Sequence, residues 1–161
     1  MKTFIVISDT HGNRAAIDKL DPLFAESDYI IHLGDTSGDG AAIRKRYPDK
    51  TCLLNGNCDI MRCGESETIL DVEGVRIFAC HGDRYGVKRT YERIAEKARE
   101  EGCGVALFGH THQASEEEMY GVKLFNPGTL SRYSHKSYLY LVVSDGKATG
   151  KIVDADALIE S

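Results

Sequence analysis

The chain of 161 residues carries 20 lysines and arginines against 25 aspartates and glutamates, which gives a formal net charge of −5. This length fits a single domain, 1–161, and 42% hydrophobic with 28% charged residues is typical of a soluble globular protein. The negative charge argues against a nucleic-acid binder held by bulk charge. No apolar stretch approaches the roughly 20 residues that cross a bilayer, so we expect no membrane partner.

Cysteine usage indicates the compartment. The five cysteines are an odd number and include no CxxC pair, which favours free thiols in a reducing environment. No signal-peptide pattern precedes the first apolar run. We therefore expect a cytoplasmic protein.

Strands and helices alternate in the first half of the chain. Apolar runs rich in β-branched residues predict buried strands at 4–8, 29–33 and 51–54. Helical spacing of apolar residues predicts helices at 13–25 and 39–47, with Pro22 as a candidate break in the first. The order strand, helix, strand, helix, strand indicates parallel βαβ units.

The second half of the chain is richer in strands. A hairpin is expected at 67–72 and 75–79, turning at Glu73-Gly74, followed by a helix at 86–101 and a buried strand at 104–108. Short strands complete the chain, at 117–120, 122–125, 138–144 and 150–154. We find no internal repeat and no domain boundary.

Five of the expected strands end in a small polar cluster. These clusters hold seven side chains of metal-ligating type: Asp9, His11, Asp35, Asn57, His81, His110 and His112. Ligands of α/β sheets gather beyond the carboxyl ends of the strands, so these side chains converge if the strands share a sheet. The clusters also contain four of the six histidines in the chain.

Seven ligands suit two metal ions that share one carboxylate, with four ligands on each ion. Asp35 stands alone in its cluster and has two carboxylate oxygens, so it is the candidate bridge between ions roughly 3.5–4 Å apart. Such a site attracts phosphate and lowers the pKa of a bridging water toward neutrality. The residues therefore indicate two-metal hydrolysis at phosphorus.

These motifs resemble those of a known family. Asp9-x-His11, Gly34-Asp35, Gly56-Asn57-x-Asp59, His81-Gly82 and Gly109-His110-x-His112 are similar in kind and order to the calcineurin-like metallophosphoesterase superfamily. The small size, Gly-Asn-Cys-Asp and the later Asn-Pro-Gly resemble its YfcE-like phosphodiesterase branch. The resemblance implies an α/β fold, a four-layer αββα sandwich of two mixed β-sheets with flanking helices.

The resemblance also implies a division of the ligands between two ions. One ion would be held by Asp9, His11, Asp35 and His112, and the other by Asp35, Asn57, His81 and His110. Mn²⁺ is the usual activating ion of the branch, and Zn²⁺, Fe²⁺ and Ni²⁺ are the alternatives.

The leading hypothesis is a dinuclear phosphodiesterase that acts on a small-molecule phosphoester. A metal-bound hydroxide would attack phosphorus in line, with Asp35, Asn57 and His81 as the catalytic metal ligands. A phosphomonoesterase is the close alternative, because charge alone does not favour a diester. A non-catalytic protein-binding scaffold, as in the retromer subunit of this fold, is a third. A homo-oligomer is left open.

Other residues near the motifs keep two interpretations. Cys58 stands where many members of the superfamily have a histidine that protonates the leaving oxygen, and a thiol is a weaker substitute. Asp59 either orients a ligand or caps a turn, and Asn13 either binds phosphate or caps a helix. His32 is expected to be a hydrogen-bonded core histidine, and His135 a surface-loop residue.

Overall fold

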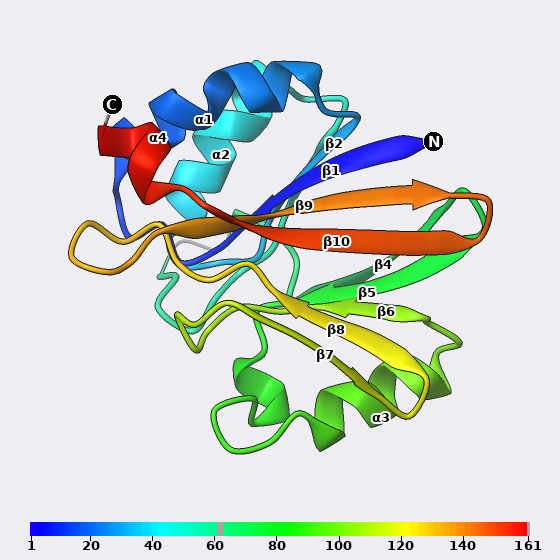
Figure 1. Ribbon diagram of the computed structural model, residues 1–161. Coiled ribbons are helices and arrows are strands. Elements are labelled where there is room, and N and C mark those ends of the chain that lie inside the picture. Colours follow the sequence, from blue (N-terminus) through cyan, green and yellow to red (C-terminus); the bar gives the residue numbers. More distant parts are fainter. Residues whose placement is uncertain (61–62, 161) are drawn as a thin grey trace.

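The computed structural model describes residues 1–60 and 63–160. It contains two five-stranded sheets that pack face to face, with helices on both outer faces (Figure 1). The expected four-layer αββα sandwich with two mixed sheets is thereby confirmed. Among the described residues, no helix is long and apolar enough to cross a membrane.

The first sheet combines parallel and antiparallel pairs in the order β10-β9-β1-β2-β3. Its parallel strands are β1 (Lys2–Ile7), β2 (Tyr29–His32) and β3 (Thr51–Leu53). They are connected by α1 (Arg14–Glu26) and α2 (Ser37–Arg46), as βαβ units require. The antiparallel hairpin of β9 (Ser137–Ser144) and β10 (Lys147–Asp154) extends the sheet, with Phe4 of β1 opposite Leu141.

The second sheet has the order β4-β5-β6-β8-β7. A hairpin of β4 (Glu67–Val72) and β5 (Val75–Cys80) leads through the 3-10 turn η1 (Asp83–Tyr85) to α3 (Glu92–Glu100). The strand β6 (Val105–Leu107) lies parallel to β5 and to β8 (Val122–Asn126), and β7 (Ser115–Met119) pairs antiparallel at the edge.

Alternation of side chains along the strands produces three hydrophobic cores. In β1, Phe4 and Val6 face the second sheet, whereas Ile5 and Ile7 face α1 and α2. A third core lies between the second sheet and α3, where Phe78 packs near Ile94. Three cores separate four layers, with α1, α2 and α4 above the first sheet in Figure 1 and α3 below the second.

Two helix predictions were wrong in part. The helix expected at 86–101 begins only at Glu92. Gly86 has a φ of 60°, and its carbonyl accepts the backbone N–H of Arg89 at 2.9 Å, so a turn forms there in place of the first helical residues. Val87 is nevertheless buried, so its apolar character marked burial and not helix. Pro22 does not break α1; it lies on the exposed face, where a carbonyl without its usual partner can be solvated.

The C-terminal helix α4 (Asp156–Glu160) was not expected from the sequence. It begins where the Asp154 carboxylate accepts the backbone N–H of Asp156 at 2.9 Å, and it packs against α1. This local hydrogen bond is a typical start signal for a helix.

Candidate metal centre

The seven expected ligands follow the carboxyl ends of five strands and lie together between the two sheets. Asp9 and His11 follow β1, Asp35 follows β2 and Asn57 lies beyond β3; His81 follows β5, and His110 and His112 follow β6. Backbone contacts join these ends. The N–H of Asp9 donates to the carbonyl of Gly34 at 2.9 Å, and the N–H of Gly109 donates to the carbonyl of His81 at 2.9 Å.

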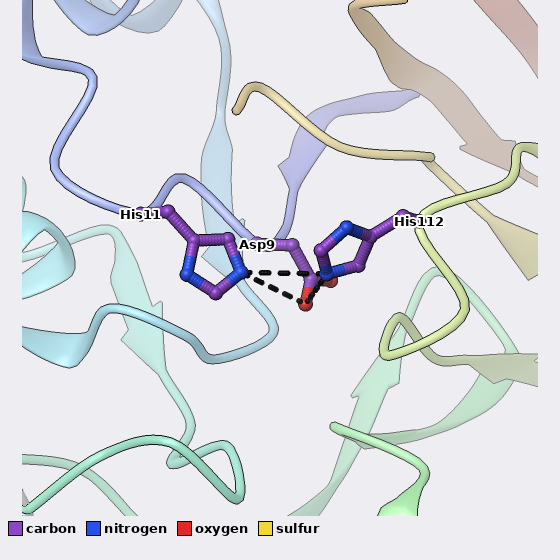
Figure 2. A group of neighbouring side chains, drawn as sticks. All are labelled: Asp9, His11 and His112. Atoms are coloured by element: carbon purple, nitrogen blue, oxygen red, sulfur yellow. Dashed lines mark hydrogen bonds and ion pairs between the residues drawn. The ribbon is translucent and has the colours of Figure 1, made fainter. Parts of the chain in front are cut away.

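Asp9, His11 and His112 form the first group of ligand atoms, and Figure 2 shows all three pointing toward one another. Nε2 of His112 lies 3.2 Å and Nε2 of His11 3.9 Å from Oδ1 of Asp9. The two ring nitrogens are 3.3 Å apart. One carboxylate oxygen and two imidazole nitrogens are a suitable ligand set for a divalent transition metal.

The second group is centred on His81. Its Nε2 lies 3.0 Å from Oδ1 of Asn57, 3.2 Å from Nδ1 of His110 and 3.4 Å from Oδ2 of Asp35. Its Nδ1 lies 2.9 Å from the carbonyl oxygen of Leu33. A hydrogen on Nδ1 would be donated to that carbonyl, which leaves Nε2 free to ligate a metal.

Asp9 joins the two groups. Its Oδ1 also lies 3.9 Å from Nε2 of His81, and Asp9, Asp35 and His81 make a further set whose ligand atoms all lie within 4.8 Å of one another. The other oxygen, Oδ2, accepts the Ser8 hydroxyl at 2.5 Å and the backbone N–H of His110 at 3.0 Å.

Oδ1 of Asp9 is buried and has no hydrogen-bond partner in the described part of the chain. A buried carboxylate oxygen without a partner is costly, and a bound cation is what compensates it in proteins. Because ring nitrogens of three histidines also surround this atom, the residues present fit a divalent metal ion.

The backbone at these ligands is strained. Five of the seven have positive φ angles, between 43° and 70°: Asp9, His11, Asp35, His110 and His112. Residues other than glycine rarely adopt this region, and such conformations gather at functional sites that the surrounding fold holds in place. Among residues 1–60 and 63–160, the other positive-φ residues apart from glycine are Glu73, Tyr120 and Asp145, and each precedes a glycine in a hairpin turn.

Glycines precede several ligands because the chain segments approach too closely for a side chain. A Cβ at Gly56 would overlap the carboxylate of Asp35, and one at Gly109 would overlap the hydroxyl of Ser8. The Gly-Asn and Gly-His pairs of the sequence motifs therefore allow ligands from separate strands to share one small space.

Burial and hydrogen bonds set the charges at the centre. Burial opposes ionisation of Asp35, but hydrogen bonds from His81 and from the backbone N–H of Cys58 hold its pKa well below the usual range. Burial alone would lower the pKa of His81, yet the Asp35 and Asp9 carboxylates raise it. Burial and the neighbouring His81 lower the pKa of His110. The Asp35 carboxylate is thus held in its ionised form.

Asp59 and Cys58 both contact the Asp35 segment. Oδ2 of Asp59 accepts the backbone N–H of Asp35 at 3.0 Å and that of Gly56 at 2.7 Å, so Asp59 holds two ligand-bearing loops together. The N–H of Cys58 donates to Oδ1 of Asp35 at 2.9 Å. The Cys58 side chain is exposed, and burial and Asp35 raise the pKa of its thiol.

Asn13 takes the helix-capping alternative. Its Oδ1 accepts the backbone N–H of Ala16 at 3.3 Å at the start of α1, and its Nδ2 donates to the carbonyl of Leu130 at 2.8 Å. The side chain is 3% exposed, so a role in substrate binding gains no support from the structure. His135 lies on the surface as expected, where it pairs with Asp156 at 2.7 Å.

Three supporting residues were not identified from the sequence. Ser8 bonds Asp9 as described above, and the Thr129 hydroxyl donates to the carbonyl of Asp9 at 2.7 Å. Nδ2 of Asn126 donates to the carbonyl of Gly109 at 3.1 Å and to the hydroxyl of Thr111 at 2.9 Å, within the loop that carries His110 and His112. The Asn-Pro-Gly motif at 126–128 was the available signal in the sequence for these contacts.

Comparison with known proteins identifies the family. The sequence model of the calcineurin-like phosphoesterase superfamily domain matches residues 1–147. The chain belongs to this superfamily. It is 31% identical over 156 residues to the probable metallophosphoesterase YsnB of Bacillus subtilis, covering 93% of this chain and 89% of that protein.

The YfcE-like branch is confirmed as well. The phosphodiesterase YfcE of Escherichia coli is 25% identical over 157 residues, covering 81% of this chain and 80% of YfcE. Membership of this superfamily and the metallophosphoesterase relatives support hydrolysis of a phosphoester with divalent metal ions by this chain.

Solved structures share the fold. A Streptococcus pneumoniae protein described as a predicted phosphoesterase superimposes with a TM-score of 0.78 at 22% identity, covering 96% of this chain and 90% of that one. Vps29 of Entamoeba histolytica, crystallised with Zn²⁺, gives a TM-score of 0.74 at 18% identity and covers 96% and 99%. At these identities the likeness concerns the fold alone.

Proposed function

We propose that this protein is a dinuclear-metal phosphodiesterase with Mn²⁺ as its working ion. The observation that carries the proposal is the buried Oδ1 of Asp9, which has no hydrogen-bond partner among the described residues. It lies among nitrogens of three histidines, and the three remaining candidate ligands lie beside this group. Seven such side chains are more than one ion uses, and two ions sharing one carboxylate account for all of them.

Each ion would have its own ligands. The first would be held by Asp9, His11 and His112, and the second by Asn57, His81 and His110. Asp35 would be shared by both, because it has two carboxylate oxygens and offers a ligand atom within 4.8 Å of those of Asp9 in the first group and His81 in the second. Asp9 is the competing bridge, since its Oδ1 lies between both groups.

The ligand types suit an anionic substrate. When bound, two divalent ions lower the pKa of a coordinated water and neutralise charge on the phosphoryl oxygens. The chain supplies only two carboxylates to the centre, Asp9 and Asp35, and completes it with neutral imidazoles and one amide. The loaded site therefore keeps net positive charge, which favours binding of a phosphate group.

Protonation of the leaving group would be weak. Cys58 is exposed to solvent, and its backbone N–H contacts Asp35. It occupies the motif position at which many members of the superfamily have a histidine that acts as the general acid. A thiol transfers a proton to an alkoxide less effectively than an imidazolium does. We therefore expect a preference for substrates whose leaving group is already a weak base, such as nitrophenolate.

The diester preference rests on the relatives, since YfcE is named a phosphodiesterase. A phosphomonoesterase uses the same centre and remains the alternative. Hydrolysis of bis(4-nitrophenyl) phosphate and of 4-nitrophenyl phosphate, measured with added Mn²⁺, distinguishes the two. A larger kcat/KM for the monoester would replace the diester assignment, and full activity of Asn57→Ala would show that the site assignment is wrong.

A non-catalytic scaffold is the second candidate, favoured by the structural likeness to Vps29. Against it, the seven ligand-type side chains are all present and converge. Purified protein that bound no metal and hydrolysed neither nitrophenyl ester in Mn²⁺ would support the scaffold in place of the enzyme.

A further inference from the structure

We propose that His32, which is not among the metal ligands, is a positioning residue that holds the first metal site through a hydrogen-bond chain from His32 to Thr10 to Asp39. The inference rests on the proposed two-metal function and concerns how one half of that centre is kept in place. All three residues are buried, with at most 3% exposure, between β2, the loop after β1 and α2.

The donors and acceptors in this hydrogen-bond chain can be assigned from His32 onward. The backbone N–H of Gly34 donates to Nδ1 of His32 at 3.0 Å, so this nitrogen carries no hydrogen. The hydrogen of the neutral ring is then on Nε2, which lies 3.0 Å from the Thr10 hydroxyl and donates to it. Burial lowers the pKa of His32 to about 4, which keeps the ring neutral at physiological pH.

Thr10 connects His32 to Asp39, which lies in α2. Its hydroxyl has one hydrogen, which it donates to Oδ2 of Asp39 at 2.6 Å. The same oxygen accepts the backbone N–H of Thr36 at 3.4 Å and the hydrogen from His32. Each hydrogen in these hydrogen bonds therefore has one assigned acceptor. If donor and acceptor were exchanged in any of them, a buried donor would face another donor.

Asp39 connects this hydrogen-bond chain to the loop after β1 and to the start of α1. Its Oδ2 also accepts the backbone N–H of Gly12 at 2.8 Å, and its Oδ1 accepts Nε of Arg14 at 3.0 Å. The chain thus connects two segments, 9–14 and 32–36. These segments carry Asp9, His11 and Asp35, three of the four ligands proposed for the first ion.

Positioning matters here because these three ligands are strained. Their φ angles are 53°, 43° and 48°, so Asp9, His11 and Asp35 would relax toward ordinary backbone conformations without tertiary restraint. Thr10 lies directly between two of them. The ligands of the second site have other supports, such as the Leu33 carbonyl for His81 and Asn126 for the loop of His110.

The hydrogen-bond chain therefore makes a selective prediction. Its loss should weaken the first metal site, which takes Asp9, His11 and Asp35 from these segments, more than the second, which takes only the shared Asp35. Thr10→Val removes the hydroxyl without changing the shape of the side chain, and Thr10→Ser restores the hydroxyl. Thr51→Val is the matched control, because the Thr51 hydroxyl donates to the carbonyl of Tyr47 at 2.8 Å, away from the centre.

The experiment is equilibrium dialysis against Mn²⁺ with electron paramagnetic resonance of the bound ions. Wild type, Thr10→Ser and Thr51→Val should bind two ions with a spin-coupled signal. Thr10→Val should bind one ion with an affinity close to that of wild type and the other about tenfold more weakly, with an uncoupled signal at limiting Mn²⁺. Adding Asn57→Ala to Thr10→Val should remove the remaining tight ion.

Each other result contradicts the proposal in a recognisable way. Two wild-type affinities in Thr10→Val would overturn the positioning role while the two-metal function stands. Equal weakening of both sites would show that Thr10 supports the fold in general and would overturn the selective role. Wild-type protein that binds no Mn²⁺ would overturn the proposed function, and with it this inference.

Discussion

Oδ1 of Asp9, at the end of β1 in one sheet, lies 3.2 Å from Nε2 of His112, which follows β6 in the other sheet. The two sheets therefore share the proposed first metal site, and packing of one sheet on the other is required to build it. Neither sheet could assemble this site alone, so the hydrophobic core between them is also what brings the ligands together.

Asp9→Asn should abolish tight binding at the first site. Oδ2 of Asp9 accepts hydrogen bonds from the Ser8 hydroxyl and the His110 backbone, so the asparagine carbonyl will take that place. Its NH₂ group then faces the metal and cannot ligate it. We expect Mn²⁺ affinity to fall by at least about 100-fold in a calorimetric titration. Asp71→Asn, on an exposed strand, is the control; unchanged affinity in Asp9→Asn would contradict the assignment.

Cys58→His should broaden the range of leaving groups. An imidazolium at this position can protonate an alkoxide, so hydrolysis of alkyl phosphodiesters should rise by about 10-fold to 100-fold, with little change on nitrophenyl esters. Steady-state rates on matched alkyl and nitrophenyl diesters measure this. Cys63→His, in the same loop region, should have no such effect. Equal rates of the wild type on both classes of diester would refute the hypothesis.

Gly109→Ala should destabilise the protein, whereas Gly104→Ala, at the other end of β6, should not. A methyl group at Gly109 would overlap the Ser8 hydroxyl and crowd Asp9, while one at Gly104 has nothing within 4 Å. Overpacking of this kind costs about 1–3 kcal/mol, measurable by urea unfolding. Similar stabilities of the two variants would mean that the close approach of the two loops is not required.

Acid should weaken the metal-free protein partly through His32. Burial lowers the pKa of His32 to about 4 in the folded state, from an ordinary value of about 6.5. The carboxylates of Asp39, Asp9 and Asp59 oppose this lowering, and His81 adds to it. The unfolded chain then binds a proton between pH 6.5 and 4 that the folded chain does not. Stability therefore falls as pH decreases through this window, by roughly 3 kcal/mol in total.

His32→Gln is the comparison for that pH dependence. Glutamine does not titrate, so the variant should lose this part of the slope when both proteins are unfolded by urea, with a chelator present, at a series of pH values. Parallel curves for the two proteins would show that His32 takes up its proton equally in both states.

The seven candidate ligands could be selected from the sequence because the signal is local. A buried strand followed at once by Asp-x-His or Gly-Asp is readable without coordinates, and the parallel βαβ order indicates where the strand ends meet. For the same reason, His32 could be separated from the ligands: it lies inside an apolar strand, and the structure confirms that it is a hydrogen-bonded core residue.

The supports of the site depend on contacts between distant segments, and these were not readable. Thr129 reaches the carbonyl of Asp9 across two sheets, and Asn126 fixes the His110 loop from β8. The spacing of Val87 and Tyr91 suggested a helical face, but Gly86 directs the chain into a turn there. Apolar periodicity reports burial, and tertiary structure decides the backbone conformation.

The two-metal centre is tested most directly by a crystal structure of the protein loaded with Mn²⁺, with anomalous scattering to locate the ions. We predict two peaks roughly 3.5–4 Å apart, one in contact with Oδ1 of Asp9 and the other with Asn57, with Asp35 contacting both. A single peak, or no ion at Oδ1 of Asp9, would contradict the account.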